Sequence, residues 1–151
     1  MSNTRDAFNK RLRLAIKEAT VLVRDKAQDN HDYTSHSGEL EKSVETRFID
    51  NGLTGEAYLD TNIASYGPFV HEGTQAYMIF PRNKKALRWF VGSNEAIFAK
   101  AVHHPGYKGD PFLYNALKSN KTAIDEIFAR HTERAVSDIA GTLRDRTYTV
   151  K

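Results

Sequence analysis

Two neighbouring histidines, His103 and His104, are the first candidates for metal binding or acid–base catalysis in this sequence. They lie in AVHHPGYKGDPFLYNAL (101–117), where Pro-Gly and Gly-Asp-Pro precede a run with helical spacing. Adjacent residues on a strand or loop point in different directions, so two neighbouring histidines rarely bind one metal ion. A third ligand would have to come from His71, Glu72 or Asp110, and no spacing in the sequence fixes that geometry. The sequence therefore favours a loop over a metal or catalytic site.

The other catalytic motifs that this sequence approaches are incomplete. VHEGT (70–74) contains the His-Glu pair of a metalloprotease, but Gln75 stands one helical turn after His71, where the second histidine is needed. No serine lies in a Gly-x-Ser-x-Gly elbow, and there is no phosphate-binding loop or dinucleotide fingerprint. The chain has no cysteine, which excludes a thiol nucleophile, a disulfide and any cysteine-ligated metal site. We therefore find no motif in the sequence that predicts a catalytic residue, a metal site or a cofactor.

The charged residues are distributed unevenly along the chain, although the net charge is only +3. Residues 31–62 hold seven acidic side chains against two basic ones, and residues 78–110 hold six basic against two acidic. Such a chain can meet copies of itself head to tail, acidic face against basic face, although a solvated mixed surface is the simpler alternative. The candidate interface residues are Arg82, Lys84, Lys85 and Arg88 in the basic segment and Glu39, Glu41 and Glu45 in the acidic segment.

The basic turn that begins at Arg82 is also the best candidate for nucleic-acid binding. Cationic side chains beside aromatic rings suit phosphate contact combined with base stacking, and Trp89 and Phe90 follow this turn. However, Trp89 alternates with Leu87 and Val91, and this period predicts that the indole points into the core. The pattern therefore favours a solvated hairpin tip or a protein interface over a DNA-reading surface.

The elements that must position these residues are predicted from hydrophobic periodicity. Apolar residues recur at steps of three and four over 1–30 and again over 110–140, which predicts two long helices. We expect Asp110 to cap the second helix, with Pro111 at its first position. Alternating residues over 40–102 predict a small antiparallel sheet, interrupted by a short helix near 63–72.

Together these elements predict a single domain spanning residues 1–151. Its fold class is α+β: two long helices flank a small antiparallel sheet with a short helical insert, and the helices cover one face of the sheet. We expect residues 141–151 to form a tail that is mobile or pairs with a neighbouring chain. No run of residues approaches membrane-spanning length, and residues 1–23 carry charges throughout, so we expect no membrane partner and no signal peptide.

Four segments, taken in order, resemble motifs of the tail-component family of long-tailed bacteriophages, the neck or tail-completion proteins. They are SGELEKS (37–43), YGPFVHEGT (66–74), IFPRNKKALRWFVG (79–92) and FAKAVHHPGYKGDPFLYNAL (98–117). Each motif is weak singly, but four in the family's order, covering residues 37–117, are strong support. One departure is His71 followed by Glu72, since many members place the acid directly after the valine. The matching residues, which the resemblance implies are structural, are Gly38, Leu40, Tyr66, Phe69, Val70, Gly73, Pro105, Gly106, Pro111 and Phe112.

The resemblance implies a non-enzymatic morphogenesis protein that forms a ring at the junction between phage head and tail. Its partners would be copies of itself, head-completion or adaptor proteins, tail terminator or tube proteins, and DNA passing through the ring, contacted without sequence specificity. Ring proteins of this kind often stay monomeric in solution until a partner templates them. The resemblance places the chain in the virion, and in the host cytoplasm during assembly. The alternative is a small DNA-binding or metal-dependent nuclease-like protein that uses the basic turn and His103 with His104.

Overall fold

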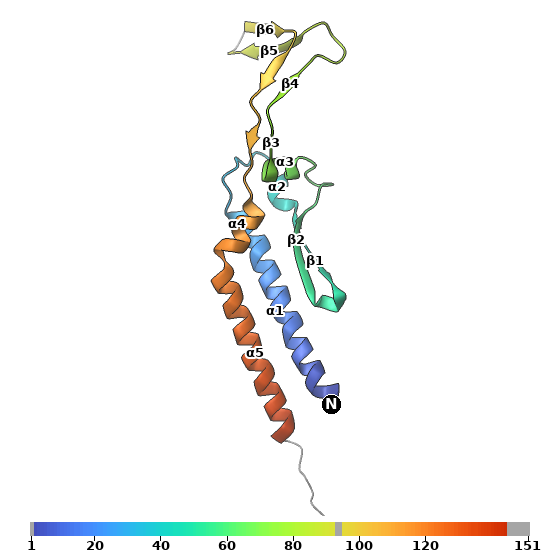
Figure 1. The fold of residues 1–151 in the computed structure, drawn as a ribbon, viewed down its shortest axis with the longest axis vertical. Coiled ribbons are helices and arrows are strands. Elements are labelled where there is room, and N and C mark those ends of the chain that lie inside the picture. Colours follow the sequence, from blue (N-terminus) through green and yellow to red (C-terminus); the bar gives the residue numbers. More distant parts are fainter. Residues whose placement is uncertain (1, 93–94, 145–151) are drawn as a thin grey trace, which may run out of the picture.

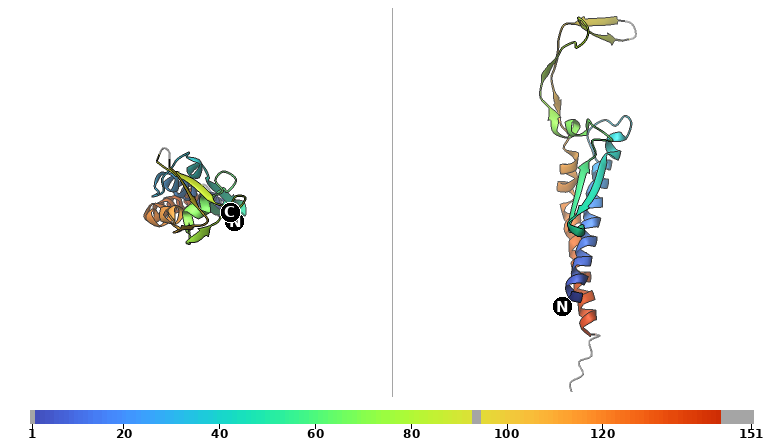
Figure 2. Two further views of the ribbon diagram at one scale, coloured as in Figure 1. Left: turned by 90° about the horizontal axis from the view of Figure 1, so that it is seen from above. Right: turned by 90° about the vertical axis from the view of Figure 1, so that its right-hand side faces the viewer.

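The structure is a computed structural model, and it describes residues 2–92 and 95–144 of the 151-residue chain. Two long helices, α1 (Ser2–Asp29) and α5 (Lys121–Arg144), lie side by side and form an elongated body (Figure 1). A narrow arm of short strands projects from the body along the same long axis, away from the end that holds the N-terminus (Figure 2). The predicted α+β class is confirmed.

Small residues let α1 and α5 approach each other closely. Ala15 and Ala19 of α1 pack against Ile127 of α5 in one buried cluster. On α5, His131 lies one turn after Ile127, and its buried ring reaches back to α1, where Nε2 lies 2.9 Å from Glu18 Oε2. Among the described residues, no helix is long and apolar enough to cross a membrane.

The second predicted helix, 110–140, is two helices in the structure. α4 (Phe112–Ser119) ends at Asn120, whose side-chain Nδ2 donates to the Ala116 carbonyl at 2.8 Å, and α5 then begins at Lys121. Asparagine competes with the helix by such local bonds, which explains the break. α5 continues past the predicted end at residue 140 to Arg144, so residues 141–144 of the predicted tail are helical. Most of the predicted tail, residues 145–151, lies outside the described residues.

The prediction of a single sheet over 40–102 is wrong, because the described strands form four separate two-stranded antiparallel ladders. The first ladder, β1 (Val44–Ile49) with β2 (Thr54–Leu59), packs on α1. Gly55 makes this contact close, since a Cβ there would collide with the Thr20 side chain. Two short helices precede the arm in the chain: α2 (Glu39–Lys42) and α3 (Gly67–Glu72).

The other three ladders follow one another outward and form the arm, which we define as residues 73–108. β3 (Gly73–Thr74) pairs with β8 (Tyr107–Lys108) at the root, and β4 (Tyr77–Ile79) pairs with β7 (Val102–His104) beyond it. β5 (Leu87–Val91) and β6 (Glu95–Ala99) form the outermost ladder. The arm stands clear of both long helices (Figure 1). The expectation that the two helices cover the sheet is therefore wrong: among the described residues, only α1 packs on a ladder, the one formed by β1 and β2.

Candidate interface: the arm and the cavity at its base

Three of the four motif segments meet where the arm joins the body. Phe112 of α4 is fully buried there, and its ring lies edge-on to Tyr33 at 5.1 Å and to His71 at 5.2 Å. Leu40 belongs to the same core cluster, and Val70 packs against it from α3. The predicted residues Leu40, Val70 and Phe112 therefore anchor the root of the arm to the helical body.

Asp110 holds a loop rather than a helix end, so the prediction that it caps the last helix is wrong. Its Oδ2 accepts hydrogen bonds from the backbone N–H of Asp32 at 2.6 Å and of Tyr33 at 3.1 Å. Pro111 occupies the N-cap position itself, and no side chain caps α4. The buried Asp110 carboxylate thus joins residues 32–33, just after α1, to the segment that enters α4. This link is made across the fold and leaves no local sequence signal.

Two predicted glycines allow the strands at the root to approach each other. Gly73 has φ 82°, and a Cβ there would lie 2.5 Å from the Gly109 backbone nitrogen. Gly106 has φ 86°, and a Cβ there would lie 2.5 Å from the Thr74 carbonyl oxygen. Any other residue would be both strained and in collision at these positions. The remaining predicted motif residues lie nearer the surface: Gly38 precedes α2, and Tyr66, Phe69, Pro105 and Pro111 are exposed.

The neighbouring histidines lie on the arm and face different ways. His104 stacks on Tyr77 with ring centroids 4.8 Å apart, and its Nδ1 accepts a hydrogen bond from the Gly106 N–H at 3.1 Å. His103 pairs with Met78 across the ladder and is exposed. Within residues 2–92 and 95–144, no three His, Asp or Glu side chains gather in a group that could hold a metal ion. His71 lies apart from this pair, buried between Phe112 and Tyr114, with Nδ1 2.9 Å from Glu72 Oε1.

The arm carries large apolar side chains in solvent. Trp89 is 38% exposed and Phe98 is 64% exposed, so the prediction that Trp89 points into the core is wrong. A two-stranded ribbon has no layer behind it, and an alternating pattern therefore separates two exposed faces instead of an inner and an outer one. Arg88 lies over the rings of Phe90 and Phe98, at 4.7 Å and 5.8 Å from their centroids.

The predicted basic residues gather at the outer end of the arm, and the predicted acidic residues do not. Arg82, Lys84 and Lys85 are exposed on the loop between β4 and β5, which we call the tip loop (residues 80–86). In contrast, Glu39, Glu41 and Glu45 lie on α2 and β1 of the body (Figure 1). The basic group therefore lies at the outer end of the arm and the acidic group lies on the body, so the two groups cannot meet within one molecule.

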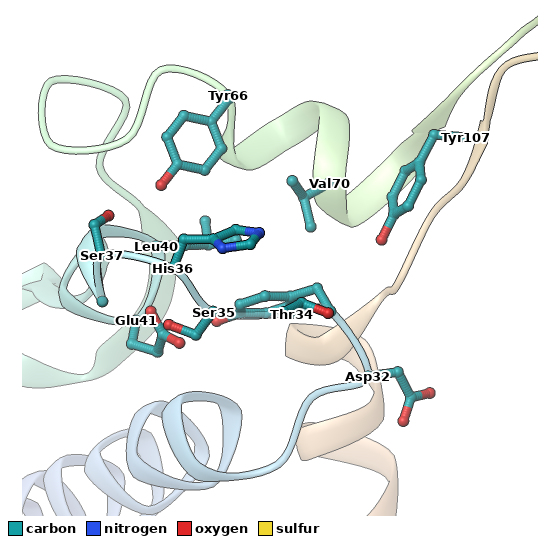
Figure 3. A pocket seen from close by; sticks show the side chains of 12 residues that line it. Asp32, Thr34, Ser35, His36, Ser37, Leu40, Glu41, Tyr66, Val70 and Tyr107 are labelled. Atoms are coloured by element: carbon teal, nitrogen blue, oxygen red, sulfur yellow. The ribbon is translucent and has the colours of Figure 1, made fainter. Parts of the chain in front are cut away.

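A cavity of about 490 Å³, which we call the base cavity, lies between the loop after α1 and helix α3 (Figure 3). Its walls combine aromatic rings with acidic side chains. The residues that define its chemistry are Asp32, Tyr33, His36, Glu41, Tyr66 and Tyr107. None of its twelve described lining residues is lysine or arginine. The sequence analysis missed this cavity, because its walls come from three separate segments of the chain: 32–41, 66–70 and residue 107.

Two polar atoms of the base cavity walls are buried without a hydrogen-bond partner: the Tyr33 hydroxyl and Glu41 Oε2. The other oxygen of Glu41 lies 3.3 Å from His31 Nε2, and the His31 ring stacks on Tyr33 at 3.7 Å. Burial raises the pKa of Tyr33 above its ordinary range, and the carboxylates of Glu41 and Asp110 raise it further. Buried polar atoms ordinarily find a partner, so the Tyr33 hydroxyl in this wall can still accept a hydrogen bond from a donor.

No family model, no curated protein and no solved structure was found to match this chain. The assignment of a function therefore depends on the motifs in the sequence and on the geometry of the arm and the base cavity.

Proposed function

We propose that this chain is a structural bacteriophage morphogenesis protein, a subunit of a ring at the head–tail junction that carries out no catalysis. The observation that carries the proposal is the arm, which projects from the body and leaves its large side chains uncovered. The exposed apolar side chains on the arm are Tyr77, Met78, Phe80, Trp89, Phe90, Val91, Phe98 and Tyr107. The four motifs that resemble the phage tail-component family support the same assignment, since they form the arm and its root.

The physical chemistry of the arm favours a partner that covers it. An isolated two-stranded ribbon is marginally stable in water, and contiguous exposed apolar side chains are a feature of interaction surfaces. The arm also carries six basic residues against one acidic residue, Glu95, so its partner surface should be acidic. A small contact of this kind becomes stable when a platform holds many copies together, which is consistent with a monomer that assembles on its partner.

In this proposal the partners are copies of the chain itself, head-completion or adaptor proteins, and tail terminator or tube proteins. The protein resides in the virion, and in the host cytoplasm during assembly. Electron microscopy of a lysate from phage lacking this gene is the decisive test. Filled heads and finished tails lying apart would support the junction role. Intact, DNA-filled, tailed particles would refute it.

Charge reversal at the arm provides a finer test of the same proposal. Changing Lys84, Lys85 and Arg88 to glutamate should reduce virion yield while leaving the monomer folded, because these side chains are exposed. The matched control reverses three exposed lysines of the body: Lys10, Lys17 and Lys118. Virion yield from complementation and the circular dichroism of the purified variants are the two measurements. Normal yield from the arm variant would contradict an assembly role for the arm.

One observation favours the alternative, a DNA-binding protein. Trp89 is exposed beside a cationic cluster, so the outer arm presents both aromatic and basic groups to solvent. Binding of this kind would weaken steeply as salt concentration rises, because phosphate contacts release counterions. A steep salt dependence, or stoichiometric bound metal at His103 and His104, would favour the alternative. Weak non-specific DNA binding would be compatible with both, since DNA passes through a junction ring.

A further inference from the structure

The base cavity has the properties of a receptor for a cationic side chain. Glu41 supplies negative charge, and Tyr33, Tyr66 and Tyr107 supply aromatic rings. Aromatic faces attract cations, and a carboxylate attracts them more strongly where water is excluded. Tyr33 is buried, with only 9% of its surface exposed, and its hydroxyl has no hydrogen-bond partner among the described residues. A lysine or arginine, which only donates, would meet this demand.

The same molecule displays such side chains where they cannot reach its own cavity. Arg82, Lys84 and Lys85 lie exposed on the tip loop, whereas the cavity lies at the root of the arm (Figures 1 and 3). The tip loop has no regular secondary structure over 80–86, so its side chains can enter a concave site. Arg88 differs, because the Phe90 and Phe98 rings hold its guanidinium on the strand ladder.

We propose that the base cavity of one copy receives a lysine or arginine of the tip loop of a second copy. The Glu41 carboxylate pairs with the positive charge of this lysine or arginine, and the tyrosines of the cavity enclose the aliphatic part of its side chain. Because tip and cavity are different surfaces, the contact is head to tail, and its repetition closes a ring or extends a filament. This inference deepens the proposed function, on which its biological role rests, by naming the two surfaces that join neighbouring subunits.

Disulfide cross-linking tests this contact directly, since the chain contains no cysteine of its own. One full-length variant carries Asn83→Cys on the tip loop, which leaves all its cations in place. A second, tagged variant carries Ser35→Cys in the wall of the base cavity, and the matched control carries Ser137→Cys on an exposed position of α5. Each pair is mixed and oxidised, and the mixed dimer is quantified by its mass.

We expect the Asn83–Ser35 pair to cross-link at least about tenfold faster than the Asn83–Ser137 pair, because docking raises the effective thiol concentration. Adding Glu41→Gln to the cavity variant should remove most of this advantage, as should high salt. Equal rates for the two pairs would overturn the contact. A fast Asn83–Ser35 reaction that ignores both Glu41→Gln and salt would overturn the cationic side chain as its occupant. Circular dichroism of each variant confirms that it is folded.

The outcome is independent of the phage experiment. Separated heads and tails in the lysate, combined with equal cross-linking rates, would leave the junction role in place and remove only this contact. Fast, charge-dependent cross-linking from a gene whose loss leaves virions intact would establish self-association and refute the junction role.

Discussion

Replacing Asp110 by alanine should cost the protein a large part of its stability. One oxygen of this buried carboxylate accepts two backbone hydrogen bonds, from Asp32 at 2.6 Å and from Tyr33 at 3.1 Å. Hydrogen bonds to a charged group each contribute about 1.5–3 kcal/mol. Asp32 is exposed, so water replaces its lost partner, whereas the N–H of the buried Tyr33 stays unsatisfied. Part of this loss is offset, because the variant no longer has to bury a charged carboxylate. We therefore expect Asp110→Ala to lower the free energy of unfolding by about 2–4 kcal/mol.

Two further variants separate this link from general effects of removing an acid. Asp110→Asn keeps an acceptor but loses the charge, and neutral hydrogen bonds are about half as strong, so we expect a loss of about 1–2 kcal/mol. Asp125→Ala removes an exposed carboxylate that pairs with Lys121 at 2.8 Å, and we expect a loss below about 0.5 kcal/mol. Urea unfolding followed by far-ultraviolet circular dichroism measures all three. An Asp110→Ala loss no larger than that of Asp125→Ala would refute the assigned role of Asp110.

Three other perturbations test the body and the root of the arm. Phe112→Ala should lower the free energy of unfolding, measured with urea, by about 3–5 kcal/mol, because this ring is fully buried. Phe69 is 61% exposed, so Phe69→Ala should change the same free energy by at most about 0.5 kcal/mol. Gly73→Ala should increase amide hydrogen exchange at the arm root, because it combines positive φ with a backbone collision. A hydrogen bond from His131 and then one from Arg130 lower the pKa of Glu18. The stability that Glu18 contributes is therefore fully present above the ordinary glutamate pKa of about 4.3. This stability is lost as the pH falls through the lower pKa of Glu18 in the folded protein. Glu18→Gln should therefore flatten the acid limb of a stability–pH curve.

Each of these expectations has a result that contradicts it. Similar losses from Phe112→Ala and Phe69→Ala would mean that the root of the arm is not the packed centre described above. Unchanged amide exchange in Gly73→Ala would show that the β3–β8 root tolerates a side chain. An acid limb that is as steep in Glu18→Gln as in the parent would assign acid unfolding to other carboxylates.

Several features of this protein follow from local sequence pattern, because their causes are local. Helical spacing predicted α1 closely, since the apolar positions that face α5 recur every three to four residues. The same reasoning placed α3 near its observed position, Gly67–Glu72. The resemblance to the phage family, rather than periodicity, marked the glycines at the root of the arm. The break at Asn120 is also local in origin, but helix periodicity continues across it and hides it.

The arm and the base cavity were decided only by the tertiary structure. Alternation at Leu87, Trp89 and Val91 identified residues that share a face of a strand, but it carries no information on whether another layer covers that face. The basic and acidic segments were visible in the sequence, whereas their separation along an extended arm was not. The base cavity and the Asp110 link join residues that lie up to 78 positions apart, and such contacts leave no periodic trace. Local sequence thus determined the elements, and long-range packing determined which of their surfaces remain free for a partner.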